Sequence, residues 1–175
     1  VNLNKLKKID KKKTILCHGV FDVVHPGHVR HLIYAKSKNK ILIVSITADK
    51  FIEKGKYRPH VPQNMRALNL AALEIVDFVI IDNNKTPIKL IKEIKPAFFA
   101  KGFEYSSKLP KSTLDEKKTV EEYGGKLIFT PGDIVYSSTK IINQTLPDLS
   151  LEKLSLLMAE NKISFQALKD TLKKF

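Results

Sequence analysis

Apolar and polar positions follow two different periods along the first 130 residues. Short runs rich in apolar and β-branched residues are typical of buried strands, whereas apolar positions three and four apart indicate amphipathic helices. Five runs predict strands, namely residues 14–20, 40–49, 77–82, 96–102 and 126–130. Four segments predict helices, namely residues 28–38, 62–76, 86–95 and 112–125.

The alternation of these strands with helices predicts the fold class. Strands that are apolar on both faces and separated by helices are typical of a parallel sheet covered on both sides. We therefore predict an α/β fold with an open, mainly parallel, five-stranded Rossmann-like sheet. Thr86 is expected to cap the third of the four helices, with Pro87 in its first turn, and Gly124 to end the fourth.

The pattern changes near the C-terminus. Residues 151–175 contain two helix-like pieces, split near Asn161–Ser164, and no strand-like run. We expect one α/β domain over residues 1–148 and a helical extension over residues 149–175. That extension is a cap on the sheet, a dimerisation element, or a linker to a further domain.

Charge adds information about the partner. The 175 residues carry a formal net charge of +13, which favours an anionic partner such as nucleic acid, acidic lipid or a phosphorylated small molecule. No apolar run reaches membrane-spanning length, and the first residues lack a signal-peptide pattern. The single cysteine, Cys17, excludes an internal disulfide and fits a reducing compartment, so we expect a cytoplasmic protein.

The segment "HGVFDVVHPGHVRHL" carries the candidate chemistry, because it joins the first strand to the first helix. Ligands of open α/β sheets bind beyond the carboxyl ends of the strands, and a helix N-terminus offers N–H groups to phosphate. His25 and His28 lie on either side of a Pro-Gly pair and could both donate to one phosphate chain. Gly27 allows the backbone to approach a ligand closely.

Two other interpretations of these histidines were weighed. Cys17 and His31 could complete a zinc site, but zinc needs three or four ligands and no CxxC or HExxH pattern is present. The rings could also be packed or merely exposed. We expect His31 to be structural or exposed and His60 to be a loop residue, whereas His18 could be either structural or functional.

Four motifs in order extend the interpretation to a family. The segments "GVFDVVHPGH", "KGKYRPHVPQNMR", "AKGFEY" and "YSSTKII" span roughly residues 14–143. They resemble the HxGH nucleotidyltransferase superfamily, the cytidylyltransferase-like group. Within it the chain is most similar to the nucleotidyltransferase domain of ADP-heptose synthases, and next to glycerol-3-phosphate cytidylyltransferases. Phe103 and Glu104 depart from the heptose pattern, which leaves the choice between ATP and CTP open.

This resemblance implies a nucleotidyltransferase that joins a nucleoside triphosphate to a sugar phosphate or polyol phosphate and releases pyrophosphate. The product would be an ADP- or CDP-activated precursor of a surface polysaccharide. The implied catalytic residues are His25, His28, Lys54 and Lys56. The implied nucleotide-binding residues are Val20, Phe21, Gly27, Arg66, Lys101, Gly102, Ser137, Ser138 and Thr139. Asp22 either caps a turn or orients a neighbour.

The same resemblance implies the cofactor and partners. A divalent cation, Mg²⁺ or a similar ion, would be held mainly by the nucleotide phosphates rather than by protein ligands. The partners would be ATP or CTP, a phosphorylated sugar or polyol, a second copy in a homodimer, and a sugar kinase domain fused beyond Phe175. We expect neither membrane nor nucleic acid as a partner, because the phenylalanines fall mostly in apolar runs rather than among basic residues.

Overall fold

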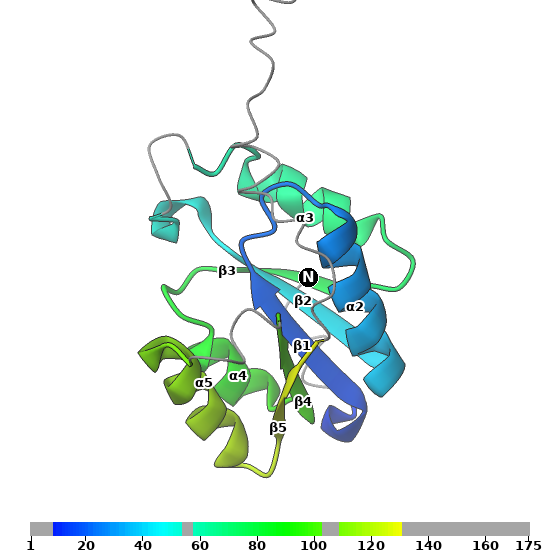
Figure 1. The fold of residues 1–175 in the computed structure, drawn as a ribbon, viewed down its shortest axis with the longest axis vertical. Helices are drawn as coiled ribbons and strands as arrows, with labels where there is room; N and C mark the ends of the chain where they lie inside the picture. Colours follow the sequence, from blue (N-terminus) through cyan, green and yellow to red (C-terminus); the bar gives the residue numbers. More distant parts are fainter. Residues whose placement is uncertain (1–8, 54–57, 103–108, 131–175) are drawn as a thin grey trace, which may run out of the picture. The chain divides into compact units, whose positions relative to one another are not determined.

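A five-stranded parallel sheet forms the centre of the protein. The structure, a computed structural model, describes residues 9–53, 58–102 and 109–130. The strands are β1 (Thr14–Gly19), β2 (Ile41–Thr47), β3 (Phe78–Asp82), β4 (Phe98–Lys101) and β5 (Lys126–Phe129). Their order is β3-β2-β1-β4-β5, and every neighbouring pair is parallel (Figure 1). The predicted fold class is therefore confirmed.

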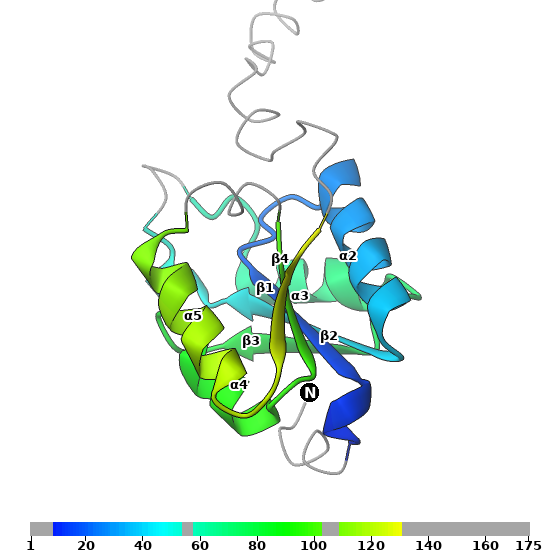
Figure 2. The ribbon, with the colours of Figure 1, turned by 60° about the horizontal axis from the view of Figure 1, so that its bottom comes forward.

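Among the described residues, four helices cover the two faces of this sheet. They are α2 (Pro26–Lys38), α3 (Gln63–Ala71), α4 (Ile88–Ile94) and α5 (Lys111–Glu121), with 3-10 turns at Lys11–Lys13 and Asp49–Phe51. Helices α2 and α3 pack on one face, and α4 and α5 pack on the other (Figure 2). The chain order reverses at β1, which has β2 on one side and β4 on the other. Such a reversal marks the ligand-binding edge of an open α/β sheet.

The side chains of each strand alternate between two apolar cores. The core under α2 and α3 contains Ile15, Cys17 and Val44, and the core under α4 and α5 contains Leu16, Ile43 and Phe99. This alternation explains why the strands are apolar on both faces in the sequence. Burial of Cys17 in an apolar core raises the pKa of its thiol, which makes the thiol a packing group rather than a nucleophile.

The helix boundaries differ from the sequence prediction at several ends; α5, for example, ends at Glu121 rather than at residue 125. Helix α3 ends at Ala71 rather than near residue 76, because the chain leaves the helix through turns in which Leu73 and Val76 donate to Leu70 and Leu73. The prediction that Thr86 is an N-cap is wrong: Pro87 is the N-cap of α4, and its carbonyl accepts from Ile91 N–H at 2.8 Å.

Other expectations have different outcomes. Gly124, with φ of +83°, follows α5 as predicted and occupies a left-handed conformation that glycine adopts without steric cost. The predicted helical extension over residues 149–175 lies outside the described residues. In the part of the chain that the structure describes, no helix has the length and apolarity needed to span a membrane.

Candidate active site

His25 starts the helix that follows β1. Its backbone is extended, with φ −133° and ψ 168°, and its Nδ1 accepts a hydrogen bond from Gly27 N–H at 3.1 Å. The side chain therefore caps α2, a task usually performed by Ser, Asp or Asn. Because Nδ1 is the acceptor, a neutral ring carries its proton on Nε2. Burial lowers the pKa of His25, which favours this neutral form.

The rings of His25 and His28 lie against each other. Their centroids are 3.8 Å apart with an angle of 28° between the ring planes, and Phe21 packs on His28 with centroids 4.9 Å apart. Phe21 is buried and adopts a positive φ of 50°, a conformation that side-chain-bearing residues rarely take. The structure thus brings three predicted site residues together at the N-terminus of α2, at the carboxyl edge of the sheet.

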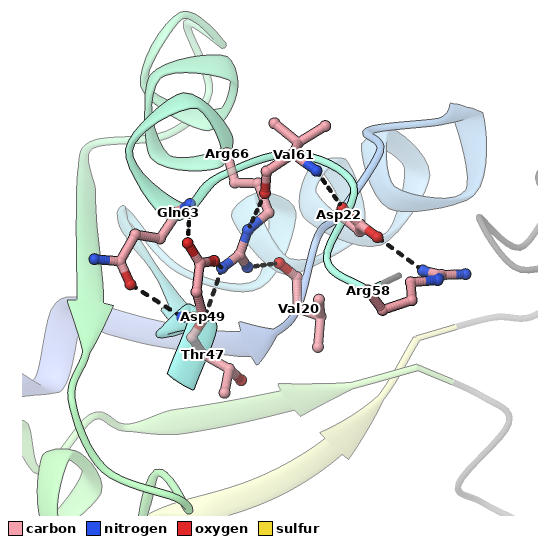
Figure 3. A network of polar contacts seen from close by, with 8 residues as sticks. All are labelled: Val20, Asp22, Thr47, Asp49, Arg58, Val61, Gln63 and Arg66. Atoms are coloured by element: carbon pink, nitrogen blue, oxygen red, sulfur yellow. Dashed lines mark hydrogen bonds and ion pairs between the residues drawn. The ribbon is translucent and has the colours of Figure 1, made fainter. Parts of the chain in front are cut away.

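Arg66 lies beneath this segment and is fully buried (Figure 3). Its guanidinium donates to the carbonyls of Val61 at 3.0 Å and Thr47 at 2.8 Å, to the carbonyl of Val20, and to Asp49 Oδ1 at 2.6 Å. All three guanidinium nitrogens are therefore used by protein acceptors. The sequence interpretation had Arg66 among the nucleotide-binding residues. The structure gives it a different contact set, in which it fixes the ends of β1 and β2 relative to α3.

Asp49 and Gln63 complete the same network. The Gln63 backbone N–H donates to Asp49 Oδ2, and the Asp49 backbone N–H donates to Gln63 Oε1, both at 3.0 Å. This reciprocal pair resembles a capping box at the start of α3 (Figure 3). It links the turn after β2 to α3, and no local sequence pattern predicts it because the partners lie 14 residues apart.

Asp22 forms a second buried anchor close to Phe21. Its carboxylate accepts from Arg58 Nη1 at 3.0 Å and from Val61 N–H at 2.9 Å (Figure 3). Burial opposes the negative charge, but backbone hydrogen bonds from Val61 and His60 and the charge of Arg58 outweigh it, so the pKa of Asp22 is lowered. Asp22 therefore orients a neighbouring segment, the second of the two roles expected for it.

Lys101 and Gly102 lie at the end of β4. Lys101 Nζ forms an ion pair with Glu116 Oε2 of α5 at 2.5 Å and lies 3.3 Å from Thr113 Oγ1. Both side chains of the pair are largely buried. Burial raises the pKa of Glu116, and the charge of Lys101 opposes that shift. The Lys101 side chain contacts α5, on the face of the sheet opposite α2.

The remaining histidines have separate environments. His31 Nδ1 is 3.0 Å from Thr130 Oγ1, which ties α2 to the end of β5, and burial lowers the pKa of His31 to about 4. His31 is thus structural, and His60 is an exposed loop residue, as expected. His18 lies at the end of β1 between two hydroxyl groups, of Ser45 and Thr47.

Five predicted site residues lie outside the described residues: Lys54, Lys56, Ser137, Ser138 and Thr139. Within the described ranges, no three His, Cys, Asp or Glu side chains cluster in a way that could hold a metal ion. Cys17, one of the two residues considered as additional zinc ligands, is enclosed in the apolar core. The neutral ring of His25 at the α2 N-terminus carries an Nε2–H donor, which suits a phosphate oxygen rather than a cation.

Comparisons with known proteins are consistent with this geometry. The sequence model of the family described as cytidylyltransferase-like matches residues 16–144. The chain is 36% identical over 142 residues to the bifunctional protein HldE of Geobacter metallireducens, covering 80% of this chain and 28% of the relative. It is 41% identical over 119 residues to HldE of Aliarcobacter butzleri, covering 66% of this chain and 25% of the relative. It therefore spans less than a third of the length of these relatives.

Solved structures show the same fold. The lipopolysaccharide core biosynthesis protein of Thermoplasma volcanium is 25% identical with a TM-score of 0.58, covering 71% of this chain and 98% of that chain. The pantoate-beta-alanine ligase of Francisella tularensis is 18% identical, also with a TM-score of 0.58, and covers 86% of this chain and 74% of that chain. At that identity, the second likeness concerns the fold alone.

Proposed function

Because the chain belongs to the cytidylyltransferase-like family, we propose that it joins a nucleoside triphosphate to a sugar phosphate or polyol phosphate and releases pyrophosphate. Its likeness to the HldE proteins favours a heptose 1-phosphate as acceptor and ATP as donor. Transfer from CTP to glycerol 3-phosphate is the alternative within the same family. Surface-polysaccharide synthesis would consume either product.

The stacked pair of His25 and His28 is the observation that carries this proposal. The pair sits where the N-terminus of α2 meets the carboxyl edge of a parallel sheet, a position suited to phosphate. Since Nδ1 of His25 accepts from Gly27 within the protein, Nε2 presents a directed N–H donor. The two imidazoles at the N-terminus of α2 can then act on one phosphate chain.

The proposed reaction needs no protein nucleophile. An oxygen of the acceptor phosphate attacks the α-phosphorus, a new P–O bond forms, and the bond to the β-phosphate breaks. The electron pair of that bond leaves with pyrophosphate. The barrier comes mainly from charge repulsion and positioning, so donors that face the developing charge supply the catalysis. His25 and His28 would donate to oxygens of the α- and β-phosphates.

Other residues would support this step. The backbone of Val20 and Phe21 and the close approach at Gly27 would border the nucleotide, with Arg66 and Asp22 acting as positioning residues beneath them. Lys101 and Gly102 would lie near the acceptor or nucleotide. The residues Lys54, Lys56, Ser137, Ser138 and Thr139 keep their proposed phosphate-binding roles from the sequence resemblance.

A divalent cation fits this arrangement only through the nucleotide. Among the described residues no protein cluster could hold it, and the converging N–H donors suit phosphate oxygens. When bound to the triphosphate, Mg²⁺ would neutralise part of its charge. We propose no protein ligand for it.

The relatives suggest further partners. They are called bifunctional, and this chain matches less than a third of their length, so we propose that nucleotidyl transfer is one of two linked activities. A sugar kinase that supplies the phosphorylated acceptor would be the other. The α/β unit proposed here covers residues 1–148 and the extension covers residues 149–175.

We further propose a homodimer that forms through the outer face of α3. Met65 and Leu68 are 56% and 61% exposed, although both are large and apolar. Arg66 is the one charged residue between Gln63 and Leu73, and it is buried. In a chain of net charge +13, this uncharged strip lets two copies approach without opposing like charges. Light scattering in solution measures the mass that decides the question.

Pyrophosphate release tests the proposed function directly. Each of the four nucleoside triphosphates is combined with heptose 1-phosphate, mannose 1-phosphate and glycerol 3-phosphate in the presence of Mg²⁺. We expect release with one triphosphate and one class of acceptor. Release from no combination, or tight salt-sensitive binding of oligonucleotides without nucleotide binding, would overturn the proposal.

His28→Ala provides the residue-level test. Loss of one donor to the transition state typically lowers turnover by about 10²–10³-fold, and the fold should persist because the ring lies at the edge of the sheet. His60→Ala is the matched control, since that histidine is an exposed loop residue. Equal turnover of the two variants would refute the role of the pair.

A further inference from the structure

The face of the sheet under α4 and α5 changes from apolar to polar at its carboxyl edge. Leu16, Ile43 and Phe99 are apolar and buried on this face. Two residues further along the same strands, the side chains on this face are those of His18, Ser45 and Lys101. One step further along, Thr47 of β2 is in register with Asp82 of β3. We call His18, Thr47, Asp82 and Lys101 the polar row; it crosses four neighbouring strands.

His18 forms one hydrogen bond with another member of the polar row, Thr47, and a second with Ser45 beside it. His18 Nδ1 lies 2.7 Å from Ser45 Oγ, and His18 Nε2 lies 3.3 Å from Thr47 Oγ1. Burial lowers the pKa of His18 to about 3, with a smaller contribution from the charge of Lys101. The imidazole is therefore neutral, and it holds a threonine hydroxyl at the end of β2.

Asp82 has a carboxylate oxygen that the described residues leave without a hydrogen-bond donor. Its Oδ1 accepts from Asn84 N–H at 3.0 Å and from Asn84 Nδ2 at 2.7 Å. Its Oδ2 is buried and has no hydrogen-bond partner among the described residues, although Asp82 is only 3% exposed. A buried carboxylate oxygen without a donor is costly, so such an atom marks a place where a ligand hydroxyl would be favourable.

The charges of the polar row determine which ligand it fits. The charge of Lys101 is balanced by Glu116 at 2.5 Å, His18 is neutral, and burial raises the pKa of Asp82, although its hydrogen bonds with Asn84 oppose that shift. The row thus suits uncharged hydroxyl groups. Phosphate is better placed at His25 and His28, which lie beyond the same end of β1.

Arg66 connects the polar row to the segment that leads to His25. It donates to the carbonyl of Val20, on the segment that leads to His25, and to the carbonyl of Thr47, whose side chain belongs to the polar row. The rigid guanidinium of Arg66 therefore fixes the position of the segment before His25 relative to the polar row.

We propose that the polar row is the acceptor subsite of the enzyme, where Asp82 Oδ2 and Thr47 Oγ1 bind hydroxyl groups of the sugar or polyol while its phosphate faces His25 and His28. This proposal rests on the proposed function and deepens it. The row, rather than the nucleotide contacts, would then determine which phosphorylated sugar reacts.

The test uses Asp82→Asn in the full chain, with heptose 1-phosphate and its monodeoxy derivatives as acceptors. We expect the KM for heptose 1-phosphate to rise about tenfold or more, while the KM for the nucleoside triphosphate stays within about twofold. Against wild type, one deoxy derivative should be a poor acceptor. The Asp82→Asn variant should no longer distinguish that derivative from heptose 1-phosphate.

Controls separate this role from a structural one. Asp77→Asn changes a carboxylate at the opposite end of β3, where Oδ2 accepts from Leu42 N–H at 2.6 Å, and should leave the acceptor KM unchanged. If Asp82→Asn does not fold by circular dichroism, Thr47→Val, which keeps the side-chain shape, decides the question by the same measurements. An unchanged acceptor KM in the folded variant, or unaltered discrimination among deoxy derivatives, overturns the proposal. Absence of pyrophosphate release in wild type overturns the proposed function instead.

Discussion

Replacement of Arg66 by lysine should weaken the fold far more than this conservative change suggests. The buried guanidinium reaches three backbone carbonyls and Asp49 from three nitrogens that point in different directions. A lysine ammonium is a single point on a flexible stem and cannot reach acceptors that surround a planar group. At least two of the four hydrogen bonds would therefore be lost.

The magnitude follows from the kind of bond that is lost. A hydrogen bond to a charged group contributes about 1.5–3 kcal/mol, so two lost carbonyl contacts cost about 3–6 kcal/mol. The bond to Asp49 adds less, because that carboxylate is 38% exposed and screened by water. Since a whole domain is stable by only about 5–15 kcal/mol, Arg66→Lys should remove a large part of the free energy of unfolding.

Urea unfolding followed by circular dichroism measures this loss. Arg30→Lys, on an exposed position of α2, is the matched control and should change the free energy of unfolding by less than about 0.5 kcal/mol. Turnover of Arg66→Lys under conditions where it is folded should also fall, since the Val20 carbonyl loses its donor. A loss of stability below about 1 kcal/mol would refute the assignment of Arg66 as the central anchor.

Two further predictions concern pH and backbone geometry. The pKa values of His18 and His31 are lowered to about 3 and about 4 by burial, so the unfolded state takes up protons that the folded state does not. The contribution of these two histidines to the free energy of unfolding should be fully present above the unfolded pKa near 6.5. It should fall as the pH drops toward 4, by about 1.4 kcal/mol per pH unit for each histidine. Urea midpoints between pH 7.5 and 4.5 measure this slope, which should be shallower in His31→Gln; an equal slope would contradict the attribution. Gly125→Ala should destabilise more than Gly124→Ala, because its Cβ would lie 2.9 Å from Pro96 O, whereas at Gly124 only the positive φ is unfavourable. Thermal melting of the pair checks the order, and a greater loss at Gly124 would contradict it.

The sequence predicts the sheet and the helix-terminal pair well because both depend on local patterns. Each apolar run and the HPGH turn consists of consecutive residues, so the structure that each predicts can be derived without knowing which distant residues it contacts. The family implied by the four motifs is confirmed by the match over residues 16–144. The roles of individual site residues remain predictions.

The partners of Arg66 and Asp22 could not be derived in the same way. Asp22 meets Arg58 across 36 positions, and Arg66 meets Val20 across 46. Such pairs depend on tertiary contacts that no periodicity reveals. The sequence interpretation assigns Arg66 to nucleotide binding only because the segment "KGKYRPHVPQNMR" resembles the motif of the family. Its burial becomes visible only when α3 is placed against the ends of β1 and β2.

The hydrogen bond from Gly27 to His25 restricts how this protein can change over time. Ser or Asp at position 25 would cap the helix at least as well as histidine. Selection for stability alone would therefore favour one of these two residues. Either replacement would remove the ring and its Nε2 proton. Under the proposed function, helix stability and catalysis therefore place opposing demands on one side chain.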